Sequence, residues 1–217
     1  MNNQCVDRDL LALEPVIYTG GGCESQQLAA GQDGAIAGTD FTSDGADFEA
    51  CGIAAGMVLC VVGAAPAETR AYEIIERAGD TSLTVSVLRA HTDDPPLPPP
   101  PGTELNYFVL SFRPQIAAAA DSLRMKLGQL IEAGGVDAAA FEQSPDFCQA
   151  VAMAALSSIF AARAASADKT DLNWAKAELY RQRHQALLAG VRLAQDLDGD
   201  GYAEHTRTLG HIRLRRA

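Results

Sequence analysis

Charge and hydrophobic patterning both change close to Pro114, and this coincidence constrains the fold more than any other feature of the sequence. Residues 1–113 carry 16 acidic and 5 basic side chains, whereas residues 114–217 carry 12 of each. The first segment has the short apolar runs and the alternation of strands, and the second repeats apolar residues at intervals of three and four, as helices do. We therefore expect an α+β protein with a β-rich domain over 1–113, a helical domain over 114–204 and an extended basic tail over 205–217.

The clearest strand signal in the first segment is Thr81–Leu88, in which apolar residues alternate with hydroxyl-bearing ones. Tyr72–Arg77 precedes it across an Ala-Gly-Asp turn, so the two stretches predict a hairpin. Further strands are expected at Met57–Val62 and Leu105–Phe112, with shorter strands among turns over 31–48. Together they predict a small acidic β-barrel or sandwich.

Six prolines fall within residues 93–102, between the expected hairpin and the last expected strand. Proline favours polyproline II and cannot donate to a β-ladder, so this segment predicts an extended, semi-rigid loop. We favour a spacer or protruding loop. The alternative is a ligand for an aromatic-lined groove.

The second segment predicts three helices. The first begins at Pro114 and ends before a Gly-Gly pair, and the second has Ser144 as its N-cap with Pro145 at the first helical position. The third begins near Asp171 and carries an apolar stripe beside a basic face. On this helix a tryptophan can serve equally as a core anchor or an interface residue, and a histidine fits a core or interface position better than a ligand position. We expect subunit or domain contacts at Trp174, Tyr180, Arg183 and His184.

A loop with calcium-type spacing follows the third helix. Asp196, Asp198 and Asp200 occupy positions 1, 3 and 5 of an EF-hand-like loop, with glycine at position 6 and Glu204 at position 9. Position 12, which should be a bidentate glutamate, is Arg207. We favour an Asx-rich turn over a calcium site.

The cysteines, histidines and other reactive residues do not form a recognisable catalytic motif or zinc-binding motif. The five cysteines contain no Cys-x-x-Cys pair and do not cluster with the four histidines, so we expect them to behave as buried hydrophobes. The sequence lacks nucleophile-elbow, zinc-protease and phosphate-loop motifs, so we predict no enzymatic activity and no cofactor. A net charge of −11 argues against a free-standing nucleic-acid binder. The start of the chain does not resemble a secretory signal. We identify no apolar run long enough to cross a bilayer, and therefore expect no membrane association.

The last 13 residues, from His205, contain arginines and no acid. Apolar residues alternate with these arginines near the end, a strand-like pattern. Such a tail can add to a sheet edge of a neighbouring protein, with its arginines pairing to acids there. The residues expected to dock are Arg207, Ile212, Arg213, Leu214, Arg215 and Arg216.

Several short motifs occur in a characteristic order along the chain. They are Asp-Leu-Leu-x-Leu-Glu-Pro (Asp9–Pro15), Gly-x-x-x-Gly-Met-Val (Gly52–Val58), Thr-Ser-Leu-Thr-Val (Thr81–Val85), Pro-Gln-Ile (Pro114–Ile116), Ala-Glu-Leu-Tyr-Arg-x-Arg (Ala177–Arg183), the Asp-Leu-Asp-Gly-Asp-Gly loop and the Leu-Gly-x-Ile-Arg-Leu-Arg-Arg tail. This order resembles the head–tail connector, or adaptor, proteins of tailed bacteriophages and related gene-transfer particles. Residues 114–217 carry most of the resemblance.

The resemblance implies a structural virion protein, assembled in the host cytoplasm and located in the neck of the particle. It implies a ring of identical subunits, usually twelve, beneath the portal protein, which the tail would reach. Double-stranded DNA would pass through the ring without sequence-specific binding, and the next neck or tail protein would attach to it. An acidic first half could line the channel and repel phosphate, or it could keep the exterior soluble. The alternatives are another virion role, in tail completion or capsid stabilisation, and a calcium-dependent binding module.

Overall fold

The computed structural model describes residues 5–20, 24–63, 68–131, 141, 144–166, 170–195 and 205–208. The chain forms two compact units, one of residues 6–113 and the other of Cys5 with the described residues from Pro114 onward. The predicted α+β class is confirmed: the first unit contains a β-barrel, and three long helices follow it in the second.

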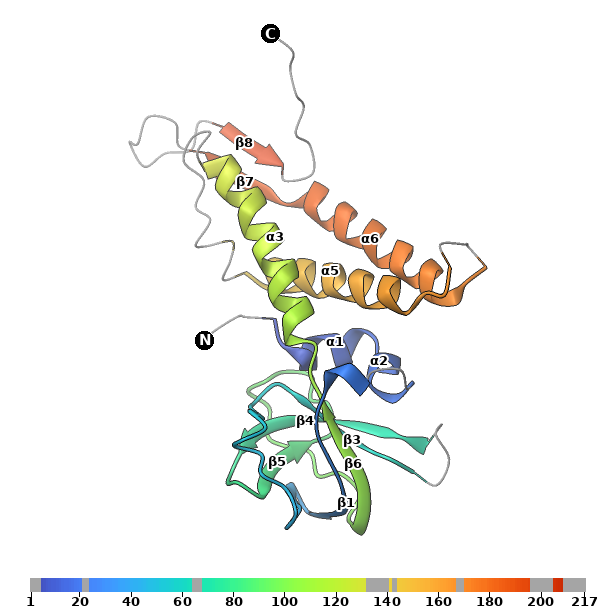
Figure 1. The fold of residues 1–217 in the computed structure, drawn as a ribbon. Coiled ribbons are helices and arrows are strands. Elements are labelled where there is room, and N and C mark those ends of the chain that lie inside the picture. Colours follow the sequence, from blue (N-terminus) through green and yellow to red (C-terminus); the bar gives the residue numbers. More distant parts are fainter. Residues whose placement is uncertain are drawn as a thin grey trace. The chain divides into compact units, whose positions relative to one another are not determined.

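Six strands form a closed antiparallel barrel in the order β1-β2-β5-β4-β3-β6 (Figure 1). Pairing of β1 with β6 closes it, and the predicted hairpin is confirmed as β4 and β5. A closed barrel leaves no unpaired sheet edge, which resolves the choice between barrel and sandwich. The strands are β1 (Gln27–Ala37), β2 (Asp40–Thr42), β3 (Val58–Val61), β4 (Arg70–Arg77), β5 (Ser82–Ser86) and β6 (Gly102–Leu110).

Strand β1 is longer than the sequence predicted. We expected short strands among turns over 31–48, but β1 continues for 11 residues and pairs with both β2 and β6. Only two of its residues, Gly34 and Ile36, are buried, so it lacks the apolar alternation that identifies a strand. Gly31 has a packing role here, because a Cβ atom at this position would lie 2.6 Å from Cε1 of Tyr107.

Three aromatic rings occupy the barrel interior. The ring centroids of Phe41 and Tyr107 lie 4.8 Å apart in an edge-to-face arrangement, and Phe48 lies 6.1 Å from Phe41. All three side chains are buried, and aliphatic residues from the surrounding strands and loops complete the core: Ile36, Ile53, Met57, Leu59, Ile74, Leu83, Val85 and Val109.

Two short helices that the sequence did not reveal, α1 (Asp7–Leu13) and α2 (Val16–Thr19), pack at one end of the barrel (Figure 1). The buried carboxylate of Asp7 accepts hydrogen bonds from the backbone N–H of Phe112 at 2.6 Å and from Oγ of Ser111 at 2.7 Å. Burial raises the pKa of Asp7, and these hydrogen bonds oppose the shift. Asp7 therefore fastens the first helix to the residues that follow β6.

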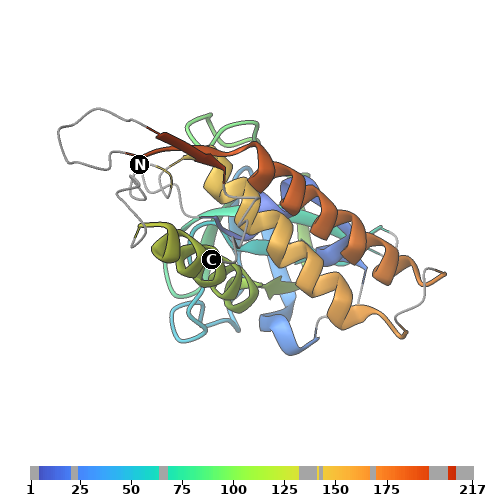
Figure 2. The same ribbon diagram turned by 90° about the horizontal axis from the view of Figure 1, so that it is seen from above.

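The second unit contains the helices α3 (Arg113–Ile131), α5 (Pro145–Arg163) and α6 (Leu172–Gly190). Helices α5 and α6 run side by side (Figures 1 and 2). Both predicted helix starts are confirmed: Ser144 accepts a hydrogen bond from the N–H of Phe147, and Asp171 accepts from the N–H groups of Asn173 and Trp174. Where the extended tail was expected to begin, β8 (His205–Thr208) pairs antiparallel with β7 (Arg192–Gln195).

Helix α5 corrects one expectation from the sequence. Within the described part of the chain it is the one helix long and apolar enough to cross a bilayer. We had expected no apolar run of that length from the sequence. Nine of its 19 residues are buried, as in the central helix of a packed core, and three of the nine are alanines.

Candidate functional site

The four residues predicted to form contacts on α6 divide between core and surface. Tyr180 is 4% exposed, and its ring stacks on that of Phe160 with 5.9 Å between centroids. Arg183 is exposed, with its guanidinium carbon 5.6 Å from the centroid of Tyr180. Trp174 is partly buried in the first turn of α6. Tyr180 thus joins α5 to α6 within one chain, whereas Arg183 and part of Trp174 lie at the surface.

His184 also joins the two helices. Its Nδ1 atom lies 2.9 Å from the backbone oxygen of Ala150. Burial lowers the pKa of His184; the nearby charge of Lys126 lowers it further, and the hydrogen bond to Ala150 opposes the shift. The lowered pKa favours the neutral ring, and because a backbone oxygen can only accept, the Nδ1–H group donates to Ala150.

A surface groove of about 260 Å³ lies among α3, α5 and α6. Most of its lining consists of alanine and serine, which permit close approach by another backbone. One buried oxygen in the lining, Oε1 of Gln115, has no hydrogen-bond partner among the described residues. The lining residues are Gln115, Ala118, Ala119, Ser122, Leu123, Lys126, Ala154, Ser158 and His184.

A buried charge cluster lies in the barrel unit, centred on Glu73 of β4, which is 1% exposed. Its Oε1 accepts hydrogen bonds from Nε of Arg89 at 2.6 Å and from the backbone N–H of Arg89 at 3.1 Å. Its Oε2 accepts from Nε of Arg8 on α1 at 2.5 Å. One carboxylate thus holds two guanidinium groups, and both of its oxygens are used.

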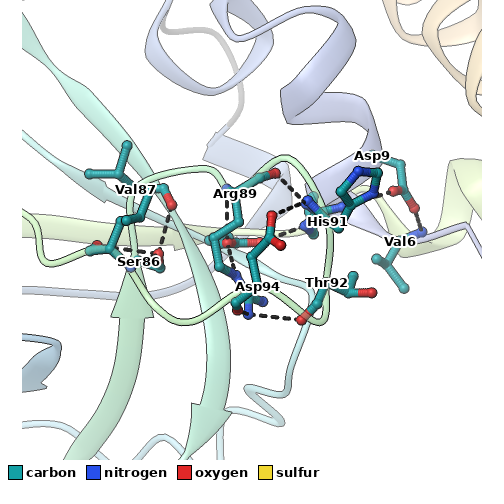
Figure 3. Close-up of polar contacts among 11 residues, drawn as sticks. Val6, Asp9, Ser86, Val87, Arg89, His91, Thr92 and Asp94 are labelled. Atoms are coloured by element: carbon teal, nitrogen blue, oxygen red, sulfur yellow. Dashed lines mark hydrogen bonds and ion pairs between the residues drawn. The ribbon is translucent and has the colours of Figure 1, made fainter.

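The guanidinium of Arg89 fixes the start of the proline-rich loop (Figure 3). Its Nη1 donates to the backbone oxygens of Thr92 at 2.8 Å and Asp94 at 2.6 Å. The carboxylate of Asp94 in turn accepts from the N–H of His91 at 2.9 Å. Arg8 reinforces the same region by donating through Nη2 to the backbone oxygen of Arg89. The cluster therefore connects α1, β4 and the loop.

The sequence pattern did not predict this cluster, because its members are distant in the chain. Arg8 and Glu73 are 65 residues apart, and Glu73 and Arg89 are 16 apart. Glu73 stands between Tyr72 and Ile74 in a predicted strand, and because side chains alternate across a strand this position looks like that of an ordinary solvent-facing glutamate. No local signal therefore marked it as a buried charge.

A second polar feature of the barrel is a series of side-chain hydrogen bonds that runs from Tyr107 through Ser43 to Asp33. The Tyr107 hydroxyl donates to Oγ of Ser43 at 2.8 Å, and Ser43 donates to Oδ1 of Asp33 at 2.7 Å. Asp33 also accepts from the N–H of Gly45, and this bond and the one from Ser43 lower its pKa. Ser43 is 1% exposed, so the chain of bonds fixes the β2–β3 connection instead of presenting a nucleophile.

Several predicted site residues lie outside the described part of the chain. These are the candidate calcium ligands Asp196, Asp198, Asp200 and Glu204, and the docking residues Ile212, Arg213, Leu214, Arg215 and Arg216. Arg207 belongs to β8, of which the backbone is described.

Comparison of the chain with family models, with curated proteins and with solved structures found no match.

Proposed function

We propose that this chain is a structural protein of a tailed-bacteriophage particle, a head–tail connector that forms a closed ring of identical subunits beneath the portal. The order of sequence motifs supports this proposal. The described buried charges support it as well, because Asp7 and the Glu73 cluster are engaged in holding backbone and helices together.

The observation that carries the proposal is an apolar stripe left uncovered on α6. Leu172 is 81% exposed and Leu179 is 43% exposed, and a spacing of seven residues places both on one side of the helix. Met125 on α3 is 67% exposed. Burying a fully exposed side chain of this size contributes about 1.5–3 kcal/mol. A neighbouring copy that covers the stripe would gain the part of this energy that corresponds to the surface still exposed. A contact between different faces of identical subunits closes into a ring when the rotation permits.

The remaining parts of the chain take the roles implied by the resemblance. The basic tail, including Arg207, docks on the portal, DNA passes through the ring, and the next neck or tail protein binds the ring. Trp174 and Arg183, at the surface of α6, contribute to contacts between subunits. The acidic residues of the barrel unit repel DNA phosphate if they face the channel.

Mass measurement of the purified protein tests ring formation. The wild-type protein should show a species of ring mass, alone or after addition of the portal protein, in the presence and absence of EDTA. Leu172→Glu combined with Leu179→Glu should abolish that species, because it places charges in the contact. Leu28→Glu, at a half-exposed leucine of β1, is the matched control and should leave the ring intact. Persistence of the ring in the double variant would contradict the assigned contact, and loss of the ring in EDTA would favour the calcium-dependent module.

A further inference from the structure

The proline-rich loop is locked into an extended conformation by its own sequence. Proline fixes its own φ angle near −65°, and it also confines the residue before it to the extended region. All residues over 94–101 are prolines apart from Asp94 and Leu97. All of them are also followed by a proline, apart from Pro96 and Pro101. The described part of the chain contains no cis peptide bond. The segment is therefore preset as a polyproline II ligand.

The fold holds this segment at two points. Arg89 binds the backbone oxygens of Thr92 and Asp94 at its beginning. In its middle, the N–H of Leu97 donates to Oγ of Ser86 at 2.7 Å, and the oxygen of Leu97 accepts from the N–H of Val87 at 2.9 Å. A flexible proline-rich tail would lose conformational entropy on binding, whereas this segment has already lost most of it on folding.

A polyproline II helix repeats every three residues, so residues 95–101 fall on three edges, and most of them are exposed. Pro99 is the one buried residue of 95–101 and faces the protein, whereas Pro96, on the same edge of the helix, is exposed. Pro95, Pro98 and Pro101 form a second edge, and all three are exposed. Leu97, at 49% exposed, and Pro100 form the third edge. A polyproline II helix docks through two of its three edges, and two are open here.

We propose that the exposed loop Asp93–Gly102 is a docking ligand for a partner protein that carries an aromatic-lined groove with a basic rim. The aromatic lining suits the Leu97 and proline edges. The basic rim suits the exposed carboxylates of Asp93 and Glu104, which flank the segment, and the acidic excess of the barrel unit. This inference adopts the alternative to the spacer or protruding loop favoured from sequence, and it does not depend on the connector proposal. Glu73 and Arg89 are positioning residues for the loop.

Nuclear magnetic resonance titration against known polyproline-binding domains tests the inference. Isotope-labelled SH3, WW and EVH1 domains serve as probes, and the unlabelled full-length protein is the titrant. We expect saturable shifts of the groove aromatic resonances in at least one domain. Leu97→Ala combined with Pro98→Ala should weaken that binding roughly tenfold or more, as expected for contacts at the centre of an interface. Pro145→Ala, at an exposed proline of α5 in the other unit, is the matched control and should leave it unchanged.

A second variant tests whether the conformation of the loop, and not only its side chains, contributes to binding. Glu73→Gln leaves every exposed side chain of the loop unchanged but weakens the ion pair that positions Arg89. It should therefore weaken binding while the barrel stays folded. Circular dichroism of each variant establishes that it is folded. Absence of shifts with all three domains, or equal binding by the Leu97 and Pro98 double variant, would overturn the proposal.

Discussion

Nε of Arg89 lies 2.6 Å from Oε1 of Glu73, and this contact ties the beginning of the proline-rich loop to the barrel wall. Glu73 is 1% exposed and Arg89 is 9% exposed, so the pair is shielded from water. Arg8 occupies the other carboxylate oxygen, which extends the link to α1. Three segments that are distant in sequence thus depend on one buried carboxylate.

Glu73→Ala should lower the free energy of unfolding by about 3–5 kcal/mol, because removal of one member of a buried ion cluster leaves its partners uncompensated. Urea denaturation followed by circular dichroism measures the change. Glu49→Gln is the matched control: Glu49 pairs with Arg77 at 3.1 Å, but its side chain is 65% exposed, so the change should be small. An equal decrease in the free energy of unfolding in the two variants would show that the buried Glu73 cluster stabilises the fold no more than an exposed ion pair does.

Asp7→Ala should release the N-terminal helices from the barrel. The substitution leaves the N–H of Phe112 and the hydroxyl of Ser111 without their acceptor, and each unsatisfied buried donor costs about 1–3 kcal/mol. Limited proteolysis should therefore cut within residues 5–20 faster than in the wild type. Asp44→Ala, at an exposed aspartate, should leave the cleavage rate unchanged, and protection of the N-terminal helices in Asp7→Ala would refute their attachment through this carboxylate.

Gly31→Ala should destabilise the barrel by about 1–3 kcal/mol, because the added methyl group would overlap the Tyr107 ring. Thermal unfolding followed by tyrosine absorbance reports the loss. Gly190→Ala, where a Cβ meets nothing within 4 Å, is the corresponding control and should be neutral or slightly stabilising. A neutral Gly31→Ala would mean that Tyr107 can move without cost.

His184 should make the helical unit less stable in mild acid. The pKa of His184 in the folded protein lies below its ordinary value of 6.5, so the unfolded chain binds the proton more readily. The stabilisation is complete above about pH 6.5 and is lost as the pH falls through 6.5 toward the folded pKa. Denaturation followed by the fluorescence of Trp174, the single tryptophan, isolates this unit. His184→Gln should flatten the pH dependence between pH 7.5 and 5, and an unchanged slope would assign the effect to other groups.

Local signals in the sequence predicted local structure well. Ser144 followed by Pro145 predicted the start of α5, and the alternation over Thr81–Leu88 predicted β5, because in both cases the determining residues are neighbours. Strand β1 was underestimated because its backbone pairing with β6, rather than apolar side chains, maintains it.

The candidate site depended on contacts that no local pattern contains. The contact between Glu73 and Arg89 follows from the pairing of β4 with β5, in which Glu73 lies opposite Ser86, three residues before Arg89. The loop itself was visible as a proline run, but its two fixed points, at Arg89 and Ser86, were not. Tyr180 was assigned to contacts from its place on an apolar stripe, and the structure places it against Phe160.

Electron microscopy of the parent particle, with an antibody against this chain, tests the connector proposal most directly. We expect a closed ring of label at the neck, between the portal and the tail. Label on the capsid shell or at the tail tip, or a particle that lacks the chain altogether, would contradict it.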